Sequence, residues 1–97
     1  MTRDEAIRSL KVSEPDLKNA GVRHLYLFGS TARGEATSTS DVDLFFDRDL
    51  GALGLFDLMD IKELAAGILG TNTDMIPRRG LHPLLRKKIE ESAVQIF

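Results

Sequence analysis

The sequence predicts an α/β (α+β) fold in which a small mixed β-sheet is flanked by helices. Residues 22–28 are rich in β-forming side chains and stop at Gly29, a pattern that is typical of a strand. Residues 57–69 instead carry apolar side chains at helical spacing, with Gly70 directly after them, which is typical of a helix and its end. The expected order of elements is α-α-β-β-α-β-α, within one domain that covers residues 1–97.

Two short helices are expected before the first strand. Thr2 and Glu5 have the spacing of a capping box, in which a threonine N-cap and a glutamate at N3 satisfy free backbone amides. A second helix is predicted to begin at Ser13, because Pro15 is tolerated in the first turn of a helix. Gly21 suits the position just past the end of that helix, where a positive φ is common.

In the remaining segments, apolar side chains either alternate with polar ones, as in strands, or recur every three or four residues, as in helices. Residues 30–34 are expected to form a turn or the first turn of a helix, and residues 35–40 a small polar loop. The other expected elements are strands over 41–47 and 73–76, a helix over 84–93, and a last segment, 94–97, that either frays or adds an edge strand.

Composition excludes several classes of function. No apolar stretch approaches the roughly 20 residues that span a bilayer, and the N-terminus lacks the apolar core of a signal peptide, so no membrane association is expected. The absence of cysteine excludes disulfides and thiolate metal sites, and a reducing cytoplasm is the expected location. A formal net charge of −2 argues against direct binding of nucleic acid.

The segment from Gly29 to Gly34 is a candidate phosphate-binding turn. Glycine allows the close approach of backbone amides that an anion needs, and Ser30 and Arg33 add a hydroxyl group and a cation. The turn is not a P-loop, because that motif requires Lys-Ser/Thr directly after Gly34, and it is not a dinucleotide-binding turn, because that motif requires glycine at position 31. An ordinary strand-to-helix turn remains the alternative.

A pair of carboxylates follows this turn. Asp41 and Asp43 are expected on one side of a strand, roughly 7 Å apart at Cα, and Ser40 before them can orient the loop or contact a phosphate. Carboxylates are ligands that Mg²⁺ prefers, and a third acid would complete a site for two ions. Asp74, in the short strand over 73–76, is the candidate for that position. Asp47 has the same strand parity, but its place at the strand end favours the surface.

Together these residues resemble a known signature. Gly29-Ser30-x-Ala32-Arg33-Gly34, then Ser40-Asp41-x-Asp43-Leu44 and the later Asp74, are similar to the motifs of the DNA polymerase β-like nucleotidyltransferases, and the chain length resembles that of the minimal nucleotidyltransferase (MNT) proteins. The resemblance implies that fold and the transfer of a nucleotide monophosphate from a nucleoside triphosphate, ATP in the first instance, to a hydroxyl group. It further implies that Gly29, Ser30, Arg33 and Ser40 contact nucleotide, and that Asp41, Asp43 and Asp74 bind two Mg²⁺ ions and carry catalysis.

The resemblance also implies a protein partner. Minimal members often pair with an α-helical HEPN protein, an RNase toxin, and serve as the antitoxin by AMPylating a tyrosine of the partner, so a hetero-oligomer is expected. Two alternatives stay open: an antitoxin that only binds and occludes the toxin, and a transferase that acts on a small molecule. The basic segment 78–88, which lacks acids, is expected either on the solvated surface or as a wall that receives the triphosphate or an acidic partner.

Overall fold

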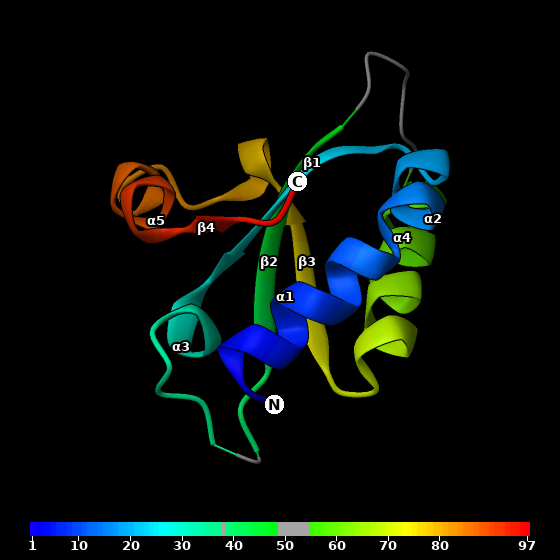
Figure 1. Cartoon of the computed structure of the whole chain (residues 1–97). Coiled ribbons are helices and arrows are strands. Elements are labelled where there is room, and N and C mark those ends of the chain that lie inside the picture. The colour runs from blue at the N-terminus through cyan, green and yellow to red at the C-terminus, as the bar shows by residue number, and fades with distance from the viewer. Residues whose placement is uncertain (38, 49–54) are drawn as a thin grey trace.

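The structure is a computed structural model that describes residues 1–37, 39–48 and 55–97, and of the helix that begins at Leu55 it describes the side chains from Asp57 onward. Figure 1 shows the arrangement of its helices and strands. In chain order these are α1 (Arg3–Val12), α2 (Glu14–Asn19), β1 (Val22–Phe28), α3 (Gly29–Ala32), β2 (Val42–Arg48), α4 (Leu55–Leu69), β3 (Thr73–Pro77), the 3-10 turn η1 (Arg78–Gly80), α5 (Arg86–Ser92) and β4 (Val94–Gln95).

The strands form one mixed four-stranded sheet with the order β3-β2-β1-β4. β1 pairs antiparallel with both β2 and β4, whereas β2 and β3 run parallel. A parallel pair needs a long crossover between its strands, and α4 lies in that crossover. The chain therefore forms the mixed sheet that the sequence predicts. The last segment, 94–97, was expected either to fray or to add an edge strand. The edge strand is observed, with Tyr26 of β1 opposite Gln95 of β4.

The hydrophobic core lies between one face of the sheet and the helices α1, α2 and α4, which cover that face (Figure 1). Alternate residues of β2 supply its centre, because successive side chains of a strand point to opposite faces. The fully buried members from the strands and helices include Leu10, Leu17, Leu25, Leu27, Val42, Leu44, Phe46, Ile61 and Ala65. Within the described residues, no helix is both long enough and apolar enough to cross a membrane.

The predicted helix ends agree closely with the structure. The Thr2 hydroxyl accepts a hydrogen bond from the Glu5 amide, which confirms Thr2 as the N-cap of α1. The Glu5 carboxylate accepts a hydrogen bond from the Thr2 hydroxyl, a different contact from the one to a backbone amide that a capping box has. Gly21 and Gly70 both have positive φ after their helices. Several boundaries differ by a residue or two. The helix α5 is shorter than the predicted helix over 84–93, and Asp41 lies just before β2 rather than inside it. The start of α4 and the end of β3 also extend beyond the predicted residues.

The other face of the sheet carries an aromatic cluster capped by an arginine. The rings of Tyr26 and Phe45 stack with centroids 4.7 Å apart, and the Arg78 guanidinium lies 4.8 Å and 5.2 Å from their centroids. Arg78 also donates hydrogen bonds of 2.6 Å and 3.0 Å to the two carboxylate oxygens of Asp47. Asp47, which was expected at the surface, is half-buried with 29% of its side chain exposed, because Arg78 of η1, directly after β3, folds back onto its carboxylate.

Candidate functional site

The glycine turn rests directly on a carboxylate of the neighbouring strand. β1 ends at Phe28, and Gly29 continues with φ +76° into the single turn of α3. A Cβ added to Gly29 would collide with a carboxylate oxygen of Asp43 and would lie 3.1 Å from its Cγ. Only glycine therefore allows both this φ and this approach. The expected phosphate-binding turn and one of the expected metal-binding acids lie side by side.

The parallel pairing of β2 and β3 brings a second acid to the same place. Asp74 is directly opposite Asp43 in the ladder, and directly opposite residues project from the same face of a sheet. The antiparallel pairing of β1 and β2 places Phe28 opposite Asp43 on its other side. The turn, Asp43 and Asp74 therefore follow one another across three adjacent strands, on the face that the helices α1, α2 and α4 leave open.

The carboxylates of this site repel one another. The pKa of Asp43 is raised by its burial first, then by the negative charge of Asp74 and by that of Asp41, while the positive charge of Arg33 lowers it. Burial and like charges both disfavour the ionised form of an acid. Asp43 is half-buried, whereas Asp41 and Asp74 are exposed. The site thus holds more negative charge than its own cations balance.

The other expected nucleotide ligands lie in and after the turn. The Arg33 side chain is exposed and forms an ion pair of 3.1 Å with Glu35. The Glu35 amide in turn donates a hydrogen bond to the Ser30 carbonyl oxygen, which closes the turn. The Ser40 hydroxyl accepts a hydrogen bond from the Thr37 amide at 2.9 Å. Ser40 thus orients the loop before Asp41, which is one of the two roles considered for it.

A hard divalent cation fits the chemistry of this donor set. Asp41, Asp43 and Asp74 offer only carboxylate oxygens, which Mg²⁺ prefers. Besides burial, the negative charges of Asp74 and Asp41 raise the pKa of Asp43, and a bound cation would offset this part of the effect. In the part of the chain that the structure describes, no three His, Cys, Asp or Glu side chains are close enough together to form a preassembled metal cluster. Repulsion between the acids opposes such a convergence when no cation is bound.

Sequence reasoning missed the network around Arg78. Besides Asp47, this arginine contacts Glu90, and Glu90 also accepts a hydrogen bond of 3.1 Å from Arg86. The network joins β2, the 3-10 turn η1 and α5 on the open face. The run of bases in 78–88 signals a charged segment, but nothing local reveals that one of them returns to a residue 31 positions earlier.

Comparison with known proteins gives three findings. Residues 9–96 match the family model described as "Nucleotidyltransferase domain". A Methanocaldococcus jannaschii protein named "Putative protein adenylyltransferase" is 35% identical over 83 residues, which are 86% of this chain and 88% of the relative. A solved structure described as a "putative minimal nucleotidyltransferase" has a TM-score of 0.80 and 33% identity, over 97% of this chain and 95% of that one.

A more distant solved structure shares the fold. A chain in the complex described as a tri-AMPylated Shewanella oneidensis HEPN toxin with an MNT antitoxin has a TM-score of 0.64 and 17% identity, over 90% of this chain and 68% of that one.

Proposed function

Because this chain belongs to the nucleotidyltransferase domain family, and so is a nucleotidyltransferase, we propose that it transfers AMP from ATP to a hydroxyl group on another protein, with Mg²⁺ as cofactor. The observation that carries the proposal is the contact between the Gly29 turn and Asp43, with Asp74 in register beside it. A triphosphate bound at the turn would have its α-phosphate close to the carboxylates. This arrangement suits phosphoryl transfer, in which catalysis is mostly positioning and charge stabilisation.

The turn would hold the donor nucleotide. The backbone amides around Gly29 and the Ser30 hydroxyl would bind the β- and γ-phosphates, which become the leaving pyrophosphate. Arg33, now paired with the exposed Glu35, is within reach of added negative charge, since exposed ion pairs are weak and exchange partners readily. Ser40 holds the loop that leads to Asp41 and would contact the nucleotide from that side.

The carboxylates would bind the cation and accept the proton of the attacking hydroxyl group. Asp41, Asp43 and Asp74 would be the ligands of Mg²⁺, which when bound neutralises the developing charge on the phosphates. Asp74, on the outer strand, would accept the proton of the attacking hydroxyl. A bond then forms between the hydroxyl oxygen and the α-phosphorus, while the bond from the α-phosphorus to the bridging oxygen of the β-phosphate breaks. AMP ends on the acceptor oxygen, and pyrophosphate leaves with the electron pair.

The acceptor is proposed to be a HEPN-type toxin, which this chain would neutralise as its antitoxin. A relative at 35% identity is named for adenylylation of protein. A chain with the same fold occurs in a complex of an MNT antitoxin with an AMPylated HEPN toxin. The two proteins would meet as a hetero-oligomer, with the acceptor hydroxyl on the toxin.

A labelling experiment tests the proposal. Wild-type chain is incubated with Mg²⁺, ATP labelled on the α-phosphate, and a purified HEPN-type protein from the same genome. The test variant is Asp41→Ala/Asp43→Ala, and the matched control is Asp60→Asn, which removes an exposed acid on α4. We expect label on the partner with the wild type and the control, and a loss of about a hundredfold or more in the double variant.

Two outcomes contradict the proposal. Label that persists in the double variant means that these acids do not carry the reaction. Loss of toxin activity without any label, in both the wild type and the double variant, means that the chain neutralises its partner by occlusion. Omission of Mg²⁺, with EDTA present, separates the cofactor requirement from the role of the acids themselves.

A further inference from the structure

Large apolar side chains are exposed at three places among the described residues: Val12 at the end of α1, Met59 on α4, and the neighbours Leu84 and Leu85 just before α5. A single apolar residue on a surface is ordinary, whereas a contiguous apolar patch is a candidate for contact with another molecule. Leu84 is 87% exposed and Leu85 is 51% exposed. Both leucines are therefore accessible, and they are the adjacent pair in this set.

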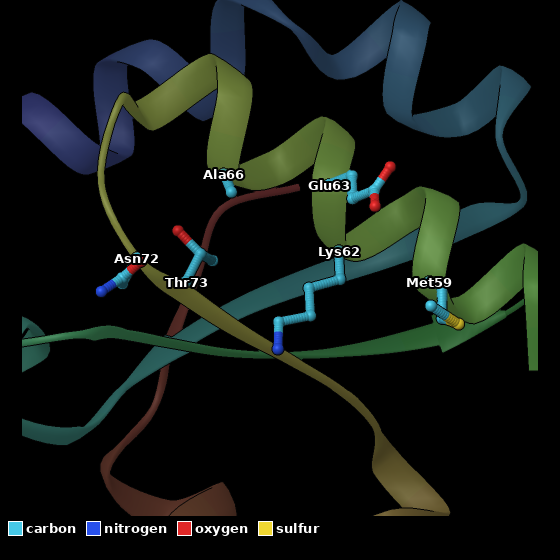
Figure 2. A pocket seen from close by; sticks show the side chains of 6 residues that line it. All are labelled: Met59, Lys62, Glu63, Ala66, Asn72 and Thr73. Carbon is cyan, nitrogen blue, oxygen red and sulfur yellow. The ribbon is translucent and has the colours of Figure 1, made fainter.

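Met59 belongs to a groove of about 280 Å³ between α4 and the start of β3. The groove is lined by Met59, Lys62, Glu63, Ala66, Asn72 and Thr73 (Figure 2). Its two charged members, Lys62 and Glu63, have opposite signs, so the groove selects neither an acidic nor a basic partner. It also lies on the side of the sheet that α4 covers. A molecule in the groove would be separated by the sheet from the candidate acids, which project from the other face.

Two lysines lie beside the exposed leucines. The Ile89 amide donates a hydrogen bond to the Leu85 carbonyl oxygen, so the helical turn begins before the first residue of α5. Residues three and four positions apart lie on the same side of a helix, which places Leu84 close to Lys87 and Lys88. Both lysine side chains are exposed. Leu84, Leu85, Lys87 and Lys88 together are called the α5 surface below.

The positive charge of the α5 surface is not offset by ion pairs. Arg78 and Arg86, the half-buried bases of the same segment, are paired with acids. Lys87 and Lys88 have no carboxylate within ion-pair distance in residues 1–37, 39–48 and 55–97. Glu91, also exposed, lies one turn beyond Lys87 and marks the end of the basic stretch. The α5 surface thus has an apolar centre with positive charge at its border, which an acidic protein surface complements.

The α5 surface has a fixed place relative to the candidate acids. Glu90 of α5 and Asp47 of β2 both pair with Arg78, so α5 is tied to the strand that carries Asp43. Asp47 and Asp43 project from the same face of β2, four residues or about 13 Å apart. Figure 1 shows α5 apart from α1, α2 and α4. A protein bound to α5 can therefore extend over the open face to Asp43 and Asp74 without crossing the sheet.

We propose that the α5 surface is the docking site of the protein acceptor, and that the acceptor presents an apolar hollow bordered by carboxylates. This inference rests on the proposed function, and it names where the protein substrate of that site binds. Leu84, the most exposed of the leucines, fills the hollow, and Lys87 and Lys88 pair with the carboxylates at its border. Attraction between opposite charges speeds the encounter, and the apolar contact slows dissociation.

Nucleic acid fits the α5 surface less well than an acidic protein does. Proteins that hold single strands stack the bases on aromatic side chains, and leucine offers no such platform. Two lysines also neutralise few phosphates, whereas binding to nucleic acid draws its affinity from many. The formal net charge of −2 repels a polyanion further. An apolar centre with a charged border is instead the arrangement of a contact between proteins.

The first experiment measures binding kinetics without ATP. The probe is a purified HEPN-type protein from the same genome, immobilised for surface plasmon resonance. Leu84→Ser should raise koff about tenfold. Lys87→Glu/Lys88→Glu should lower kon about tenfold at about 50 mM salt and less than about twofold at about 500 mM, because salt screens exposed charges. The matched control is Lys11→Glu/Val12→Ser, which changes an exposed lysine and a 78% exposed valine at the end of α1 and should bind as the wild type does.

The second experiment measures AMP transfer to the same partner. Leu84→Ser should raise KM for the partner about tenfold, with kcat and the affinity for Mg-ATP unchanged, because the α5 surface contacts neither the glycine turn nor the acids. Leu85→Ser should raise this KM in the same direction and serves as a second variant. Both leucines are exposed, so the urea denaturation midpoints should equal that of the wild type. A rise of KM at unchanged stability separates docking from a general loss of structure.

The outcomes separate this inference from the proposed function. AMP transfer with wild-type KM in every α5 variant overturns the inference and leaves the proposed function standing. Binding that the α5 variants weaken, with no AMP transfer by the wild type, supports the docking site and contradicts the proposed function. Binding of a single-stranded RNA that Lys87→Glu/Lys88→Glu abolishes and Leu84→Ser leaves intact assigns the surface to nucleic acid and overturns the inference. Dimerisation of the chain that Leu84→Ser abolishes assigns the surface to a second copy and also overturns it.

Discussion

Replacement of Gly29 by alanine tests the contact on which the candidate site depends. Gly29 has φ +76°, and its added Cβ would lie 3.1 Å from Cγ and 3.3 Å from Cβ of Asp43, besides colliding with a carboxylate oxygen. Rotation of the Asp43 side chain can move the oxygen, but it cannot move the Asp43 Cβ. The backbone of the turn or of β2 must therefore shift by a few tenths of an ångström, and the carboxylate must leave its place beside the turn.

Two costs add in this variant, and a matched control separates them. A positive φ costs an alanine about 1–2 kcal/mol, and overpacking costs about 1–3 kcal/mol more. Gly34 has φ +72° with nothing within 4 Å of an added Cβ, so Gly34→Ala carries the first cost alone. We expect Gly29→Ala to lower the free energy of unfolding by about 2–5 kcal/mol and Gly34→Ala by about 1–2 kcal/mol.

Urea denaturation measures both free energies, and Mg-ATP affinity measures the effect on the site. The affinity should fall steeply in Gly29→Ala. Gly70→Ala, with φ +69° and open space around the added Cβ, gives the cost of positive φ far from the site. Equal losses of stability in Gly29→Ala and Gly34→Ala, within about 0.5 kcal/mol, would show that the Asp43 carboxylate does not rest against the turn, and the reasoning would fail.

The remaining predictions concern charge. Burial and the charge of Asp74 raise the pKa of Asp43 in the folded protein, so this group contributes a loss of stability as pH rises from its unfolded pKa through its higher folded pKa. Asp43→Asn should therefore stabilise the protein in EDTA at pH 7 while removing the stabilisation that added Mg²⁺ gives the wild type; a less stable variant in urea denaturation would contradict this. Arg78→Lys cannot reproduce the two-pronged pairing with Asp47 or the cation–π contacts. Because these groups are only partly buried, we expect a loss of about 1–3 kcal/mol, less than breaking a fully buried pair costs. A denaturation midpoint equal to that of the wild type would refute this expectation.

Local patterns in the sequence predict the elements well. β1 spans the predicted residues, and α4 and β3 appear where apolar spacing and turn residues place them, whereas β4 is one of two alternatives that the sequence left open. Helix caps and glycine turns depend on contacts between residues three or four positions apart, so a short stretch of sequence is enough to predict them. The end of α5 and the start of β2 shift by a residue or two, because tertiary packing decides where a hydrogen-bonded ladder begins.

Pairings between distant residues could not be predicted from local patterns. The order β3-β2-β1-β4, in which β3 is the outermost strand on its side among the described residues, decides that Asp74 lies opposite Asp43. The pairing of Asp47 could not be predicted for the same reason, because its partner Arg78 comes from beyond the crossover helix. A carboxylate at a strand end has no local signature that distinguishes a solvated position from a partly buried ion pair.

The sequence by itself determined the residue types of the candidate site: small residues in a turn, then acids at alternate strand positions, and a later acid in a short strand. Their chemistry is local, since carboxylates select hard cations and glycine admits close backbone approach. Only the tertiary structure decided that the Gly29 backbone rests on Asp43, that the acids crowd one another, and that Asp74 lies in register beside Asp43. These features depend on which strands become neighbours, and burial of the core face against α1, α2 and α4 selects that arrangement.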